Sequence, residues 1–181
     1  NAYGRARGQV KRNADRCLVM GLRIGSLEGM GRAPFWGADC RYIQAQSCPE
    51  MVNLNLATEH TLTGNIKMML QQFIDCAKDM GIKGPLDKWQ NWRQFIVDQK
   101  AEYERKTLER TERMRGKLPL HPDLVGRLAA EFFTEEYNDD YIPIIDGFTA
   151  SSFFTDWNKA INSGTVLDAA ETIGIGHGMG M

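Results

Sequence analysis

The chain has 181 residues, of which 43% are hydrophobic and 25% charged, with 22 Lys and Arg against 23 Asp and Glu. This composition is typical of a globular protein, and the length suits one domain of ordinary size. No run of about 18 apolar residues is present and no signal segment opens the chain, so we expect no membrane span. The first residue is Asn1 rather than Met, which leaves room for residues before it.

The net charge of −1 is a sum over two oppositely charged ends. Residues 1–32 carry seven basic and two acidic side chains, whereas residues 118–181 carry two basic and ten acidic ones. Such an asymmetry concerns binding partners and not the fold. We therefore expect each end of the chain to contact a partner.

The four cysteines are too few for a disulfide scaffold, so we expect reduced thiols, although the compartment stays open. Cys76 falls on the apolar face of an expected helix and is interpreted as a small buried hydrophobe. Pairing of Cys40 with Cys48 in an oxidising compartment remains an alternative.

Residues 1–46 are expected to form a basic arm and an irregular segment. Glycines loosen the arm, which could become helical from about Gln9, and the stretch from Gly29 to Gln46 shows no clear period. Residues 47–173 are expected to form a helical core, and the glycine-rich residues 174–181 an irregular tail.

Apolar spacing within the core predicts helices over about 62–80, 86–113, 122–137 and 151–162, followed by a short fifth helix from Thr165 to near Ile173. Ser47 and Glu50 resemble a capping box, and residues 52–56 alternate as a short extended segment would. The second helix is almost entirely charged beyond Tyr103, so its last turns are expected to have no buried face. The predicted fold is mainly α: a single domain of four to five helices with extended irregular N- and C-terminal arms.

Three groups of side chains are candidate partner-binding surfaces. The acidic group could dock a basic segment, although a solvated face is the simpler interpretation, and the basic arm could bind the acidic end of a neighbouring subunit or the phosphates of a nucleic acid. The groups are the basic arm (Arg5, Arg7, Lys11, Arg12, Arg16), the acidic face (Glu131, Glu135, Glu136, Asp139, Asp140) and the exposed-looking aromatic residues (Phe35, Trp36, Tyr141).

Catalytic, metal and cofactor motifs are not found. The glycine series spells neither a dinucleotide-binding fingerprint nor a phosphate-binding loop, and His60 with the cysteines lacks zinc-ligand spacing. We expect no metal and no cofactor. A small helical enzyme using Cys40 or His60 in a pocket near Trp36 is an alternative without a local signature to support it.

The leading hypothesis is a non-catalytic structural or assembly subunit of a larger complex, such as a virion, a connector or an organellar complex, held by arms that order on contact. Its partners would be other protein subunits, including copies of itself. A nucleic-acid-binding subunit that acts through the basic arm is a further alternative.

Overall fold

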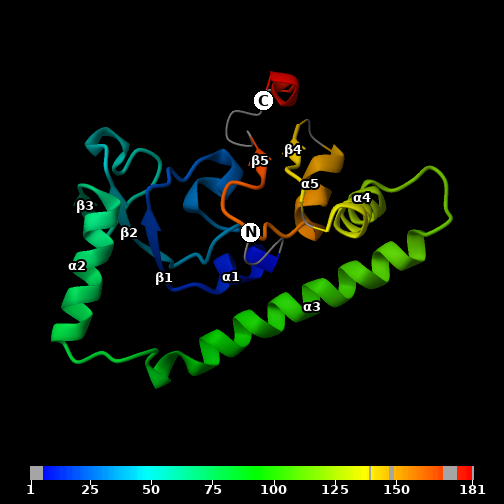
Figure 1. Ribbon diagram of the computed structural model, residues 1–181. Coiled ribbons are helices and arrows are strands. Elements are labelled where there is room, and N and C mark those ends of the chain that lie inside the picture. Colours follow the sequence, from blue (N-terminus) through cyan, green and yellow to red (C-terminus); the bar gives the residue numbers. More distant parts are fainter. Residues whose placement is uncertain (1–5, 139, 147–148, 169–174, 181) are drawn as a thin grey trace. The chain divides into compact units, whose positions relative to one another are not determined.

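A computed structural model describes residues 6–138, 140–146, 149–168 and 175–180 (Figure 1). Its α-helices are α1 Arg7–Asn13, α2 Ile66–Asp79, α3 Gln90–Met114, α4 Pro122–Tyr137 and α5 Thr149–Trp157. Its strands are β1 Arg16–Met20, β2 Arg41–Gln46, β3 His60–Thr63, β4 Ile144–Ile145 and β5 Leu167–Asp168. Short 3-10 turns lie at Ser26–Gly31, Pro49–Met51, Asp87–Trp89 and His177–Gly180.

The chain divides into two compact units whose boundary falls inside α3. Ala6–Gln99, here called the sheet unit, contains β1, β2, β3 and α2. Lys100–Met181, here called the helical unit, contains α4, α5 and the last turns of α3. Within the described residues, none of these helices is long and apolar enough to cross a membrane.

The fold is mixed, so the mainly α prediction is wrong. The structure has 51% helix and 11% strand, and the strands include a three-stranded parallel sheet. β1 and β2 lie in the stretch expected to be a basic arm and an irregular segment. The short fifth helix is wrong as well, because Leu167–Asp168 is a strand that pairs with Ile144–Ile145, while residues 169–174 lie outside the described residues.

The order of the parallel sheet is β1-β2-β3, with Leu18 opposite Ile43, Ile43 opposite His60 and Ala45 opposite Leu62. Residues in register on neighbouring strands point to the same side, and successive residues of one strand point to opposite sides. One face of the sheet therefore carries these five side chains. The other face carries Val19, Tyr42, Gln44 and Gln46.

The second of these faces forms the core of the sheet unit. Trp36 packs edge-on against Tyr42 with ring centroids 5.4 Å apart, and its indole N–H donates to the Glu28 carbonyl at 2.6 Å. The Tyr42 hydroxyl donates to the carbonyl of Gly31 at 2.9 Å. The buried apolar cluster is completed by Val19, Ile24 and Leu56.

Two glutamines are buried on this core face and anchor loops. The Gln44 side chain accepts a hydrogen bond from the Asn53 N–H at 2.9 Å, and Gln46 donates to the Leu22 carbonyl at 2.8 Å. Their side-chain amides form hydrogen bonds with backbone groups of the loops, which would otherwise be buried without a partner. Polar residues thus point inward on β2.

The three longest predicted helices are present over most of their lengths, but the first begins at Ile66 and not at Leu62, because Leu62 and Thr63 belong to β3. The side chain of Asn65 caps α2 by accepting from the Met68 N–H at 3.2 Å. Pro122 occupies the first turn of α4, which ends at Tyr137 because Asn138 adopts a left-handed conformation with φ 47°. The fourth predicted helix is also present, but α5 begins slightly earlier than expected and already ends at Trp157.

In the helical unit, α4 and α5 approach closely at Gly126. A Cβ atom on Gly126 would lie 2.7 Å from the backbone nitrogen of Phe154 and 2.8 Å from the carbonyl carbon of Phe153. Only glycine allows this approach without displacing the backbone of α5.

The last turns of α3 have a buried face, contrary to expectation. Thr107 is 3% exposed and Thr111 is fully buried. Arg110 forms an ion pair with the fully buried Asp123 of α4, and Trp157 of α5 donates to the same carboxylate at 3.2 Å. The buried face escaped sequence analysis because polar side chains form it.

Candidate protein interface

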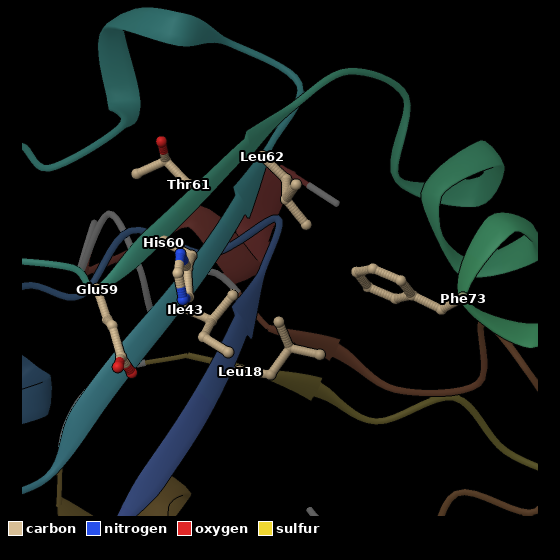
Figure 2. A pocket seen from close by; sticks show the side chains of 7 residues that line it. All are labelled: Leu18, Ile43, Glu59, His60, Thr61, Leu62 and Phe73. Carbon is tan, nitrogen blue, oxygen red and sulfur yellow. The ribbon is translucent and has the colours of Figure 1, made fainter. Parts of the chain in front are cut away.

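A hollow of ≈ 730 Å³ lies on the face of the sheet that does not form the core. Figure 2 shows Leu18, Ile43 and Leu62, one from each strand, converging with Phe73 of α2 around this space. Glu59, His60 and Thr61 complete its lining. The middle of the hollow is therefore apolar, and the end at Glu59 and His60 is polar.

Three of the four apolar side chains that line the hollow are exposed, and the fourth, Ile43, is half-buried. Leu18 is 48% exposed, Phe73 39% and Leu62 36%. A parallel sheet normally has both faces covered, because each face is apolar. Within the described part of the sheet unit, this face is left open over much of its area.

The helix α2 is similarly uncovered. Its apolar residues follow helical spacing, yet Met69 is the only buried residue of this helix. Ile74 is 49% exposed, and Cys76, predicted to be a buried hydrophobe, is exposed as well. The prediction for Cys76 is wrong because the face on which it lies has no cover in the described structure.

Two arginines lie beside the hollow and pair with Glu59, which lines its polar end. Arg16 lies 3.7 Å and Arg41 3.3 Å from carboxylate oxygens of Glu59. Both arginine side chains remain more than half exposed. Because two guanidinium groups share one carboxylate, this end keeps a positive charge.

The predicted basic arm is not a single uniform surface in the structure. Lys11 forms an ion pair with Glu28 at 2.8 Å and lies 5.0 Å from the centre of the Trp36 ring. Arg7 and Arg12 are exposed on α1, Arg16 belongs to β1, and Arg5 lies outside the described residues. The partner-binding role of the arm stays a prediction.

The three predicted aromatic contacts differ in exposure. Phe35 is 57% exposed, as expected, whereas Trp36 is only 7% exposed, so its predicted exposure is wrong. Trp36 is buried because it fills the core of the sheet unit. Tyr141 is half-buried, stacks on Phe133 at 5.4 Å and donates a hydrogen bond to Asn158.

The acidic residues lie mostly along α4 and just after it. Glu131 is tied to Arg127 at 2.6 Å, whereas Glu135 and Glu136 are exposed on the last turn and Asp140 is exposed after it. Asp139 lies outside the described residues. The structure thus places two unburied carboxylates at the C-terminal end of α4.

The outward side of α4 also carries an apolar stripe that sequence reasoning missed. Its members are exposed by 36%, 36% and 52% and are spaced three and four residues apart, namely Val125, Leu128 and Phe132. This spacing places them along one side of a helix. The apolar spacing of α4 predicts a core position for these residues, because a helix with two apolar faces gives the same pattern as one with a broad single face.

The two residues named for the enzyme alternative lie on different faces of the sheet. Cys40 packs against the core around Trp36, whereas His60 lines the hollow on the other face of the sheet. Burial is the largest cause that raises the pKa of the Cys40 thiol, which disfavours the nucleophilic thiolate. The structure does not bring Cys40 and His60 together.

Cys40 and Cys48 cannot form a disulfide in this fold. They flank the two ends of β2, whose six residues span about 20 Å at the rise of an extended strand. A disulfide needs Cα atoms within about 7 Å. All four cysteines are free thiols here.

Cys17 should be a slowly reacting thiol. Burial and the neighbouring Cys40 raise the pKa of Cys17 from 9.0 to about 11, so its thiolate fraction at pH 8 falls by roughly 100-fold. We expect iodoacetamide to label Cys17 at least that much more slowly than a free cysteine peptide. Mass spectrometry of the labelled peptides checks this, and the Cys17 rate should keep rising up to about pH 11. Equal labelling rates would contradict it.

No cluster of three His, Cys, Asp or Glu side chains that could hold a metal ion is found among the residues that the structure describes. Comparison of the chain with known protein families and with curated proteins finds no match.

Proposed function

We propose that the protein is a non-catalytic subunit of a larger protein assembly, in which neighbouring subunits cover its exposed apolar surfaces. The observation that carries the proposal is the open face of the parallel sheet together with the uncovered apolar side of α2. Contiguous exposed apolar surface costs free energy in water and typically marks a site of protein contact. A virion, a connector and an organellar complex are assemblies of the proposed kind.

The shape of the hollow favours a protein partner over a small ligand. A small-molecule site buries most of its ligand in a concave, largely closed pocket. The lining residues Leu18, Leu62 and Phe73 are each more than a third exposed, so a small molecule would stay in contact with water. A protruding side chain on a partner surface would cover the same residues and continue onto α2.

The experiment is the native mass of the purified chain over a wide range of concentration. We expect masses above the 20.5 kDa of one chain, with the larger species increasing with concentration. The double variant Phe73→Gln/Ile74→Gln should shift the distribution toward the monomer, because it removes apolar area from α2. The matched control is Gln72→Ala, which changes an exposed polar residue of the same helix.

Two outcomes would contradict the proposal. One is a monomer at every concentration that also shows slow hydrogen exchange at both ends of the chain. The other is co-purification with nucleic acid through contacts that weaken with salt, since this would favour a nucleic-acid-binding function of the basic arm instead.

A further inference from the structure

We propose that the hollow of one copy receives the outward apolar stripe of α4 from a second copy. This inference rests on the proposed function and names the partner as the chain itself. It connects two uncovered surfaces, one on the sheet unit and one on the helical unit, that match in both polarity and charge.

The apolar parts of the two surfaces fit each other. The stripe of Val125, Leu128 and Phe132 is a convex ridge along one side of a helix, and Phe132 is its most exposed member at 52%. The hollow offers apolar side chains from three strands and from α2 (Figure 2). A large aromatic ring that enters a concave apolar site is the usual centre of a protein interface.

The charges fit in one orientation. Glu136 follows Phe132 by four residues, which is about 6 Å along a helix. Arg16 and Arg41 precede Leu18 and Ile43 by two residues, which is about 6.6 Å along a strand. With Phe132 in the hollow, the acidic end of α4 can therefore lie over the arginines.

This orientation also offsets an unfavourable feature of α4. Glu135 and Glu136 lie at the C-terminal end of the helix, where the helix dipole already places a partial negative charge. Arg16 and Arg41, beside the hollow, share Glu59 as their ion-pair partner in the described structure. A contact between copies would place the negative end of α4 from one copy next to Arg16 and Arg41 of the other.

The contact is head-to-tail, because the hollow and the stripe are different surfaces. Each copy carries one of each, so every bound copy still offers a free surface for the next. Repetition of such a contact builds a ring if the rotation closes and an open chain if it does not.

A mixing experiment tests this arrangement. Phe73→Glu damages the hollow and leaves the stripe intact, whereas Phe132→Glu damages the stripe and leaves the hollow intact. We expect each variant alone to be monomeric in native mass measurements. An equimolar mixture should form a dimer of one copy of each and stop there, because only one intact hollow and one intact stripe meet.

Leu108→Glu is the matched control, because Leu108 is 43% exposed on a helix but belongs to neither surface. It should assemble like the wild type. The circular dichroism spectrum and thermal unfolding of every variant establish that it is folded.

The orientation has a separate readout in the charges. Arg41→Glu and Glu136→Arg should each weaken association by about 2- to 5-fold, the usual effect of an exposed ion pair. The double variant should recover the wild-type affinity at low salt. Recovery shows that these two residues face each other across the contact, and additive losses would overturn the proposed orientation.

Failure of this inference can be distinguished from failure of the proposed function. If the wild type assembles and either single variant assembles equally well, or if the mixture stays monomeric, the stripe does not enter the hollow, while the assembly function stands. If the wild type itself is a monomer at every concentration, the contact between copies falls, and the proposed function falls with it where both ends of the chain are also protected from hydrogen exchange.

Discussion

Replacing Arg110 with Ala is expected to lower the free energy of unfolding of the helical unit by about 3–5 kcal/mol. Asp123 is fully buried, and the Arg110 Nε atom donates to its carboxylate at 2.8 Å. Removing the cation leaves a buried carboxylate that keeps the Trp157 N–H as its side-chain hydrogen-bond donor within the described structure. Urea unfolding followed by circular dichroism measures the change.

Replacing the other member of the ion pair, Asp123, should lower the free energy of unfolding by less. Asp123→Asn keeps an acceptor for Trp157 and frees Arg110, whose side chain is 38% exposed and can turn toward water. We expect a loss of about 1–3 kcal/mol, the cost of an impaired buried hydrogen bond. A larger loss for Asp123→Asn than for Arg110→Ala would contradict this account of which charge is trapped.

Arg105→Ala is the matched control on the same helix. Arg105 also forms ion pairs, with Glu102 at 2.8 Å and with Glu109 at 2.5 Å, but its side chain is 54% exposed. Exposed pairs of this kind contribute little because water solvates the separated charges well. The unfolding midpoint of Arg105→Ala should therefore stay close to that of the wild type.

Replacing Trp36 with Ala is expected to destabilise the sheet unit by about 3–5 kcal/mol. The change empties the centre of its apolar cluster, removes the edge contact with Tyr42 and deletes the hydrogen bond to the Glu28 carbonyl. Loss of the near-ultraviolet circular dichroism of the packed aromatic rings should accompany a lower unfolding midpoint.

Trp89→Ala serves as the control for Trp36→Ala. Trp89 belongs to the same sheet unit but is 50% exposed, so its loss leaves no large cavity and should cost far less. Similar destabilisation by the two substitutions would show that Trp36 does not hold the core together.

The long helices could be predicted from the sequence because their apolar residues recur over many turns. In α2, Ile66, Met69, Leu70 and Phe73 fix the period, and Gly81 marks the end of the segment. In α4, Pro122 and Asn138 mark both ends. Such signals depend only on local backbone preferences and on one broad apolar face, which a single sequence contains.

The sheet could not be predicted because its strands are short and because β2 reverses the expected polarity. Gln44 is 2% exposed and Gln46 5%, whereas Leu18 on β1 is 48% exposed. The buried glutamines act as hydrogen-bonding partners of loops from other parts of the chain. That role depends on tertiary contacts, so no local sequence pattern indicates that these glutamines are buried.

Only the general location of the candidate interface could be predicted from the sequence. The unbalanced charges at the two ends of the chain pointed to contacts with partners, and Arg16 and Glu136 do lie on the surfaces proposed here. The hollow itself brings together residues as distant in sequence as Leu18 and Phe73. Since strand order and register create this proximity, it becomes visible only in the folded chain.

The division of the chain into units has a consequence for the order in which surfaces arise during protein synthesis. The sheet unit, Ala6–Gln99, is continuous in sequence and lies before α4. Ribosomes add about 5–20 residues per second, and compact units generally fold as they emerge. The residues that line the hollow therefore emerge from the ribosome before α4 of the same chain does, so a finished copy would meet a receptive surface on a chain still attached to the ribosome.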